Sequence, residues 1–306
     1  LADQNLYNPV TTWIESKPWD GVSRLQEFYS TVHSDSPLKE LFIRKWLLQC
    51  VAAAFSRDGL ATQGVLTFSG AQGIGKTTWF TRLAPSELDV ILIGLTLDTK
   101  NKDLVYLAVS HWIVELGELD ATMRKSDIAA LKAFITQIVD KLRRPYDAKE
   151  SHFGRRTSFC GSVNEIDFLY DVTGNRRFWT VPVTSFELND TLDMQQVWAE
   201  IYALFLAGES FALNQEEMVV LSSHNEDFTV VDPIEERLAS YFDWSSDQTK
   251  WEWMTATETL MRAGILQPTK SETISAGRAL SKLNGGKRRK SHGRKLHAVP
   301  NKEFLG

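Results

Sequence analysis

The chain alternates between stretches with a helical spacing of apolar residues and short runs typical of strands. Residues 8–60 read as helical, because Pro9 precedes Val10 and Trp13 and a second stretch runs from Leu38 to Phe55. The second stretch carries large apolar side chains at helical spacing: Leu41, Phe42, Trp46, Leu47, Val51 and Phe55. The segment WDG at 19–21 predicts a turn between the two.

A strand, a glycine loop and a helix then follow one another without a gap. The β-branched and aromatic run at 64–69 predicts a buried strand, Gly70 opens the loop, and Thr77 to Leu83 continues as a helix. Further strands are predicted at 90–95, 111–116 and 157–163. Between the last two lies a predicted helix opened by Asp127, and another spans about 196–207 and stops at Gly208. The helix after Asp127 presents one apolar face, made of Ile128, Leu131, Ile135, Ile138 and Leu142.

This alternation predicts an α/β core with a largely parallel sheet. After Asp232 the pattern changes to short helices at 232–243, 255–264 and 274–284, followed by Gly285-Gly286, KRRK, the turn SHG and the alternating RKLHAV. Three helices and a terminal hairpin describe a winged helix. The predicted organisation is a helical N-terminal segment (1–60), a nucleotide-binding core (61–215) and a winged-helix-like C-terminal domain (225–306).

Composition narrows the class of protein. The 306 residues are 43% hydrophobic and 24% charged, which suits a soluble chain with a sizeable core and excludes a disordered tail, a collagen-like fibre and a small disulfide scaffold. No apolar run approaches the ~18 residues of a membrane span, and LADQNLYNPV does not read as a signal peptide. Cys50 and Cys160 are far apart, which predicts reduced thiols in a cytosol-like compartment and no zinc site.

The net charge of −5 is unevenly distributed. Residues 267–306 hold ten Lys or Arg against Glu272 and Glu303, which leaves 24 basic and 37 acidic side chains in residues 1–266. A basic end on an acidic body predicts a nucleic-acid contact at the C-terminal end. A solvated basic tail is the alternative.

The strongest motif is a phosphate loop. Residues 70–77, GAQGIGKT, fit GxxxxGK[ST] at every fixed position. Amides freed of side chains by glycine wrap a β-phosphate, the lysine reaches the β- and γ-phosphates, and the threonine hydroxyl coordinates Mg²⁺. ATP and Mg²⁺ are therefore the expected ligands. The predicted contact residues are Gly70, Gln72, Gly73, Ile74, Gly75, Lys76, Thr77 and Thr78. The alternative is a glycine turn with an incidental lysine.

Two later strands end in polar residues that fit this loop. In HWIVELGELD (111–120), we expect Glu115 to hold Mg²⁺ and Glu118 to act as general base, although the roles could be exchanged. Asn164 ends the strand at 157–163 and is the expected γ-phosphate sensor. Arg176 and Arg177 are candidates for an arginine that reaches the γ-phosphate of a neighbouring subunit. An acidic surface turn and surface salt-bridge arginines are the alternatives.

At this point the sequence resembles a known family. GAQGIGKTT, WIVELGELD, LKAFITQIVDKLRRPY, SVNEIDFLYD and TGNRRFW look like the virulence-associated protein E family, P-loop proteins of phages, plasmids and satellite islands related to superfamily 3 helicases. The resemblance implies an AAA+-like core, a ring that is commonly a hexamer with ATP between subunits, and a DNA-contacting hairpin near Lys132 to Arg156. It also places the protein in the bacterial host cytosol. One departure from the family pattern is the segment Glu-Leu-Gly-Glu at 115–118, where superfamily 3 helicases usually carry two paired acidic residues.

Basic residues supply the candidate DNA contacts. In the pore region, single-stranded DNA is expected at Arg143, Arg144, Tyr146, Arg155 and Arg156. At the C-terminus, Arg278 and Lys282 lie on the predicted recognition helix. The predicted wing, for duplex DNA at an origin, carries Lys287, Arg288, Arg289, Lys290, Arg294 and Lys295. The alternative is a wing that touches only phosphates, or nothing ordered.

Three functions compete. The first is an ATP-dependent DNA helicase or replication initiator of a mobile element, which hydrolyses Mg-ATP between ring subunits to move along DNA. The second is a DNA-binding initiator or assembly factor that uses ATP for oligomerisation without sustained unwinding. The third, a kinase with the same loop, does not explain Asn164 followed by Arg176 and Arg177.

Overall fold

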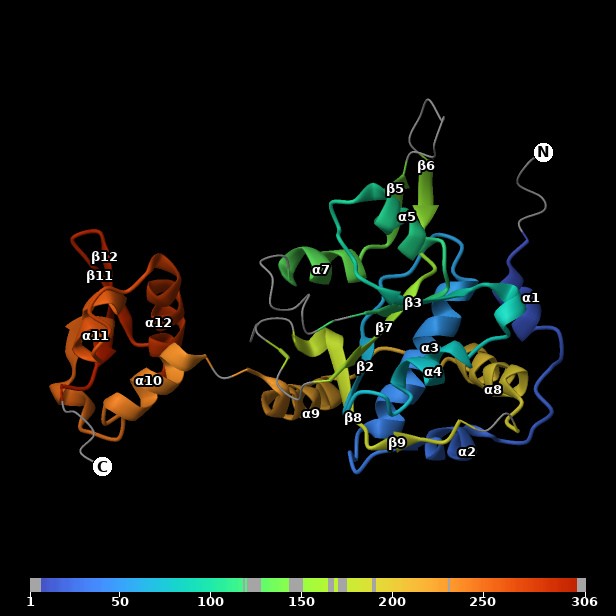
Figure 1. Ribbon diagram of the computed structural model, residues 1–306, viewed down its shortest axis with the longest axis horizontal. Coiled ribbons are helices and arrows are strands. Elements are labelled where there is room, and N and C mark those ends of the chain that lie inside the picture. Colours follow the sequence, from blue (N-terminus) through green and yellow to red (C-terminus); the bar gives the residue numbers. More distant parts are fainter. Residues whose placement is uncertain are drawn as a thin grey trace. The chain divides into compact units, whose positions relative to one another are not determined.

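The computed structural model places the chain in two compact units, residues 1–229 and 230–306 (Figure 1). It describes residues 7–117, 119, 128–142, 151–164, 168–169, 175–188, 191–230 and 232–301. None of the helices in these ranges is long and apolar enough to cross a membrane.

The first unit is built on a five-stranded parallel sheet with the strand order β3-β4-β7-β2-β8. The strands are β2 (Val65–Ser69), β3 (Ile91–Leu95), β4 (Ile113–Leu116), β7 (Ser158–Val163) and β8 (Phe178–Pro182). The predicted α/β class and parallel sheet are therefore confirmed. Four of the strands lie where the sequence predicts them, and the edge strand β8 is an addition.

Both faces of this sheet are apolar, as expected for a parallel sheet covered by helices on each side. Along β2, Leu66 and Phe68 join one buried cluster, whereas Val65 joins the other. The first cluster lies under α3 (Lys39–Phe55), α4 (Lys76–Thr81) and α8 (Met194–Leu206). The second lies under α5 (Lys102–Val109) and α7 (Ile128–Ile135). Helix α9 (Gln215–His224) and the short pair β1 (Val32–His33) and β9 (Ser185–Phe186) also belong to this unit.

The N-terminal helices are part of this unit. Helices α1 (Pro9–Ile14) and α2 (Leu25–Ser30) pack with α3 into the larger apolar cluster. Two buried indoles tie α3 to the sheet: Trp46 Nε1 donates to the Phe159 carbonyl at 2.8 Å, and Trp112 Nε1 donates to the Cys50 carbonyl at 2.9 Å. Residues predicted as a preceding segment therefore support the sheet directly. Both cysteines are buried free thiols.

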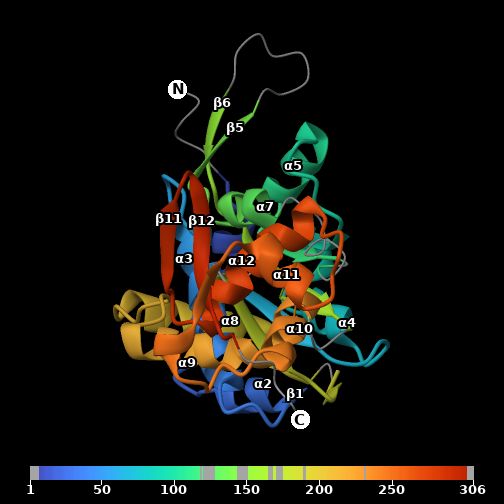
Figure 2. The same cartoon turned by 90° about the vertical axis from the view of Figure 1, so that its left-hand side faces the viewer.

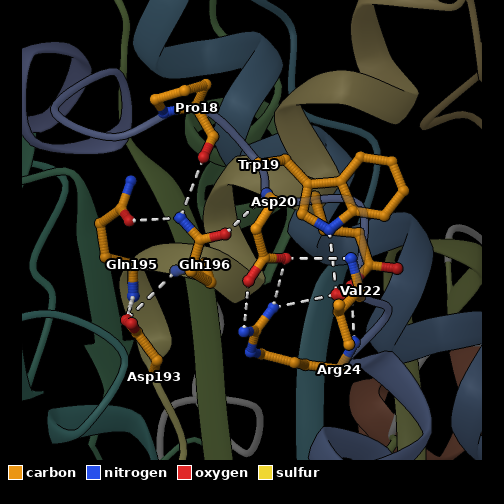
Figure 3. Close-up of polar contacts among 9 residues, drawn as sticks. Pro18, Trp19, Asp20, Val22, Arg24, Asp193, Gln195 and Gln196 are labelled. Atoms are coloured by element: carbon orange, nitrogen blue, oxygen red, sulfur yellow. Dashed lines mark hydrogen bonds and ion pairs between the residues drawn. The ribbon is translucent and has the colours of Figure 1, made fainter.

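A polar loop fastens the chain between α1 and α2 to the start of α8 (Figure 3). The Asp20 amide donates to Gln196 Oε1 at 3.0 Å, and Gln196 Nε2 donates to the Pro18 carbonyl at 3.1 Å. Asp20 and Arg24 form an ion pair at 2.7 Å. The hydrogen bond from Arg24 lowers the pKa of Asp20 from 3.8 to about 2. The side chains of Gln196 and Arg24 thus hold the predicted turn at 19–21 through their contacts with Asp20.

We expect Asp20→Asn to lower stability at neutral pH and to have no effect in strong acid. A carboxyl whose pKa is depressed in the folded state stabilises above its unfolded pKa, and this stabilisation is lost as pH falls toward the folded pKa of about 2. Urea denaturation at several pH values should show a gap between wild type and variant that is constant above about pH 5 and shrinks below about pH 4. A gap independent of pH would contradict the role of this ion pair.

One predicted helix is shorter than expected. Helix α7 ends at Ile135, and the following residues form β5 (Val139–Leu142), which pairs antiparallel with β6 (Ser151–Gly154). The prediction that Ile138 and Leu142 continue the helical face is wrong, and Ile138 is 49% exposed. The physical reason is the ladder from β6, with Val139 opposite Gly154, a long-range partner that local spacing does not reveal. Asp127, the predicted start of the helix, lies outside the described residues.

The second unit contains three helices and a three-stranded antiparallel sheet of order β10-β12-β11 (Figure 2). Its elements are α10 (Pro233–Tyr241), β10 (Glu252–Met254), α11 (Ala256–Arg262), α12 (Lys270–Leu283), β11 (Arg288–Ser291) and β12 (Arg294–Val299). His292 and Gly293 both have positive φ, 47° and 75°, which gives the tight turn between β11 and β12. Helix α12 starts four residues before the predicted 274, because Thr269 and Glu272 form a capping box.

Candidate functional site

The candidate site lies at the carboxyl ends of three neighbouring strands. Strand β7 stands between β4 and β2, so the ends of all three meet at one edge of the sheet. Glu115 lies in β4, Asn164 follows β7, and the loop 70–75, here called the glycine loop, follows β2. In open parallel sheets, ligands bind outside the carboxyl ends of the strands where the strand order reverses. Strand β2 is that point, because the chain moves from β2 to β3 on one side and from β7 to β8 on the other.

Glycine is required in this loop for two different reasons. Gly73 and Gly75 have φ of 83° and 100°, a backbone region that other residues adopt at a cost. A Cβ at Gly70 would lie 2.3 Å from the Val183 carbonyl oxygen, so only glycine allows this close approach. Gln72 is exposed and Ile74 is half-buried beside Gly70. Thr78, the last predicted contact residue, lies exposed in the first turn of α4.

Lys76 is buried at the end of this loop. Its ammonium donates to the carbonyls of Gly70 and Ala71 at 2.6 and 2.8 Å and to Asn164 Oδ1 at 3.0 Å. Burial lowers the pKa of Lys76, and the nearby Glu115 carboxylate opposes that shift. The three oxygen partners are uncharged, so a phosphate that offered full negative charge in their place would be a stronger partner.

Glu115 is the acidic centre of the site and is only 1% exposed. Its Oε1 accepts hydrogen bonds from Thr77 Oγ1 at 2.9 Å and from Ser162 Oγ at 2.8 Å. Ser162 was not among the predicted site residues. Its signal was present in the strand period, since Glu115 pairs with Cys160 in the sheet and Ser162, two residues on, points to the same face.

This donor set suits Mg²⁺ held together with a substrate. The structure offers one carboxylate and one hydroxyl, and within the described ranges no cluster of three or more His, Cys, Asp and Glu side chains could hold a metal alone. Mg²⁺ commonly binds through one or two protein oxygens, with waters and substrate phosphates completing the octahedron. Thr77 and Glu115, the predicted metal ligands, therefore have the donor chemistry that this ion requires.

Arg176 and Arg177 lie at the opposite ends of the strands, where β2 and β8 begin. They directly precede β8, and Phe178 is paired with Val65 at the start of β2. The five residues of β2 separate them from the glycine loop, a distance of about 16 Å along the strand. Arg176 is exposed, and the two arginines line a cavity of about 190 Å³ with Trp179. They do not belong to the same site as Lys76 within one chain.

Arg177 has features of an unsatisfied anion-binding group. Its Nε and the indole Nε1 of Trp179 are buried and have no hydrogen-bond partner among the residues that the structure describes. Burial lowers the pKa of Arg177, and the neighbouring Arg176 lowers it further. An anion placed in this cavity would relieve both penalties.

The predicted pore contacts divide into three groups. Arg143, Arg144 and Tyr146 lie outside the described residues, as does the predicted base Glu118. Arg155 is a correction: it is 1% exposed, and its guanidinium pairs with both Asp140 oxygens and packs 4.1 Å from the Phe134 ring. Its role is to hold the base of the β5–β6 hairpin, which removes it from the DNA contacts. Arg156 is half-buried and lines a surface cavity.

The predicted contacts in the second unit all lie at its surface. Arg278 on α12 is exposed, whereas Lys282 is paired with Glu235 at 2.5 Å. Arg289 lies 4.5 Å from the Trp253 ring, and Lys287 lies 5.7 Å from the Trp251 ring. The other exposed members of the group are Arg288, Lys290, Arg294 and Lys295. Together they make β11, the turn and the start of β12 a basic hairpin.

Comparisons with known proteins agree with this fold. Two apo structures of the C-terminal region of NrS-1 are similar, each with a TM-score of 0.50. They share 16% and 18% sequence identity, over 94% and 97% of this chain and 78% and 79% of theirs. No curated protein matches the chain. The model of the virulence-associated protein E-like domain matches residues 14–230, more than two thirds of the sequence. The chain therefore belongs to the virulence-associated protein E-like family.

Proposed function

We propose that this protein is an ATP-dependent DNA helicase or replication initiator of a phage, plasmid or satellite island. One observation carries the proposal: the hydrogen-bonded cluster of Lys76, Thr77, Glu115 and Asn164 directly after a glycine loop with two positive-φ glycines. The loop is then a P-loop, and the first unit is an AAA+-like ATPase. Phosphoryl transfer depends mainly on positioning and charge neutralisation, which these groups supply.

Each residue of the cluster has a distinct task in this proposal. The glycine-loop amides hold the β-phosphate, and the Lys76 ammonium leaves the carbonyls of Gly70 and Ala71 to meet the β- and γ-phosphates. Thr77 and Glu115 hold Mg²⁺, which neutralises charge on the phosphates when bound. The amide oxygen of Asn164 accepts a hydrogen bond from the same ammonium. Asn164 would therefore lose this contact when Lys76 binds a γ-phosphate instead.

The site is completed between subunits. Arg176 and Arg177 cannot reach the glycine loop of their own chain, because the length of β2 lies between them. A neighbouring subunit in a ring can present this edge of its sheet to the glycine loop of the next. The unsatisfied Arg177 Nε supports an anionic partner there. The proposed assembly is a homo-oligomeric ring, for which the family suggests a hexamer.

We expect Glu115→Gln to reduce ATP hydrolysis by about 100-fold or more. The amide keeps an oxygen that can accept from Thr77 and Ser162, so folding should be preserved while the charge on Mg²⁺ is lost. The measurement is kcat together with ATP affinity across a Mg²⁺ titration. Ser162→Ala, which removes a hydrogen bond but no charge, is the matched control. Unchanged dependence on Mg²⁺ in Glu115→Gln would contradict the metal role.

DNA is the proposed partner of both units. In the first unit, the β5–β6 hairpin corresponds to the DNA-contacting hairpin that the family resemblance implies. The proposed contacts to a single DNA strand in this region are Arg143, Arg144, Tyr146 and Arg156. In the second, α12 and the basic hairpin form a winged helix that holds duplex DNA, with Arg289 on Trp253 as part of the contact surface. Charge supports this assignment, since this end of the chain is basic on an acidic body.

An initiator or assembly factor without sustained unwinding is the second candidate. The exposed basic hairpin favours it, because DNA attachment through the second unit requires no hydrolysis. Glu118→Gln separates the two functions if Glu118 is the base. In a motor, this change should stop hydrolysis and unwinding together. Unwinding that persists without hydrolysis would rule out the motor.

A further inference from the structure

A second cavity lies near the amino-terminal ends of β3 and β4, whereas the glycine loop lies at the carboxyl ends of the strands. Its volume is about 560 Å³, within the usual range for small-molecule sites. It is bounded by the start of α1, by the C-terminal ends of α3 and α5, by the residues that lead into β3 and β4, and by the base of the β5–β6 hairpin. The proposed ATPase chemistry uses none of this space.

The cavity has a cationic rim. Arg57 after α3, His152 in β6 and Arg156 after β6 all line it. None of these three side chains has a hydrogen-bond or ion-pair partner among the described residues, which differs from the fully paired Arg155 beside them. Asp140, the acidic side chain in the lining, is already paired with Arg155. The carbonyl ends of α3 and α5 also face this edge, but their partial charges are smaller than the two full charges on the arginines.

The remaining wall includes several aromatic and apolar side chains. Tyr106 on α5 is 44% exposed, and Phe153 and the buried Trp112 also line the cavity. Free guanidinium groups beside an exposed aromatic ring are the combination that binds a phosphate and stacks a base at the same time. The cavity volume is sufficient for about one or two nucleotide units.

We propose that this cavity binds a nucleotide unit of single-stranded DNA, with the phosphate between Arg57 and Arg156 and the base against Tyr106. The inference rests on the proposed function only in taking DNA as the substrate. Continuity with the hairpin favours a strand over an acidic peptide. From Lys141 to Arg156 the sequence carries six Lys or Arg against two acidic residues, and β6 leads directly to Arg156. A strand held along the hairpin would therefore reach the cavity at its base.

The test is binding of a fluorescein-labelled oligothymidylate to the full chain, measured by anisotropy between about 50 and 300 mM salt. Arg57→Ala with Arg156→Ala should raise Kd at least about 10-fold and reduce the slope of log Kd against log salt by about 0.7, because the two arginines share one phosphate and each single-strand phosphate contributes about 0.7. Lys17→Ala removes a positive charge from an exposed position that does not line the cavity and should leave the slope unchanged.

Tyr106→Leu supplies a second, independent readout. Loss of stacking should raise Kd about 5-fold or more at every salt concentration without changing the slope. An unchanged Kd and slope in the arginine double variant, with wild type binding normally, would overturn this inference and the proposed Arg156 contact, and would leave the ATPase and the other proposed DNA contacts standing. Absence of oligothymidylate binding by wild type would remove DNA as the substrate and this site with it. Equal competition by polyglutamate, together with no effect of Tyr106→Leu, would assign the cavity to an acidic peptide instead.

Discussion

Lys76→Ala should abolish ATP hydrolysis while leaving the protein folded. The change removes the one ammonium that the structure places at the end of the glycine loop, 2.6 and 2.8 Å from its carbonyls. Charge developing on the γ-phosphate would then lack its nearest protein cation. Loss of one preorganised electrostatic contact costs about 100- to 1,000-fold in kcat, and the full charge of Lys76 places the expected loss at the upper end.

The folded state should survive this substitution. Lys76 lies at the start of a helix whose apolar residues, Trp79 and Phe80, remain in the core, and alanine is a good helix former. Circular dichroism and thermal melting should therefore resemble wild type within a few degrees. Lys102→Ala, an exposed lysine at the start of α5, is the control and should keep wild-type kcat. Normal hydrolysis by Lys76→Ala would remove the whole ATPase proposal.

Arg177→Ala should be inactive alone and regain activity when mixed with Lys76→Ala. We expect kcat to fall about 1,000-fold, as for other arginines that stabilise phosphoryl transfer, while ATP affinity stays within about twofold. The structural reason is the separation of Arg177 from the glycine loop of its own chain by the full length of β2. Each hydrolysis site then needs Lys76 from one subunit and Arg177 from the next.

Mixing makes this prediction quantitative. In an equal mixture of the two inactive variants that exchanges freely, about a quarter of the interfaces pair an intact Lys76 with an intact Arg177, so activity should approach about a quarter of wild type. Arg176→Ala should be tested in the same way, because the sequence does not decide which arginine acts. A mixture that stays as inactive as its components, with rings formed normally, would contradict a shared site.

The sheet was largely predictable because its strands are buried on both faces. The run VLTFS in β2 is buried throughout and mostly β-branched, aromatic or aliphatic, and such runs identify buried parallel strands. Strand β8 was not predicted because it follows two arginines and owes its conformation to pairing with β2, more than 100 residues earlier. The apolar spacing did not reveal the β5–β6 hairpin, which only the family resemblance implied, since spacing from Leu131 to Ile138 fits a helix and only the ladder with β6 overrides it.

Part of the candidate site could likewise be predicted from local sequence, and part depends on contacts between residues far apart in the chain. Fixed spacing identified the glycine loop and Lys76, and the end of an apolar strand identified Glu115. Arg155 and Arg156 are adjacent and equivalent in sequence, yet one is buried by Asp140 and the other is free at a cavity. Only the fold separates them, because the deciding partner lies 15 residues away.

The most direct test of the proposed function is steady-state ATP hydrolysis with and without single-stranded DNA, beside Lys76→Ala. We predict Mg²⁺-dependent hydrolysis that DNA stimulates about 10-fold or more, and no stimulation in the variant. This result would show that DNA binding is coupled to ATP hydrolysis at the phosphate site. Hydrolysis that is slow and indifferent to DNA would contradict the motor and leave the initiator, whose function would then reside in the basic hairpin of the second unit.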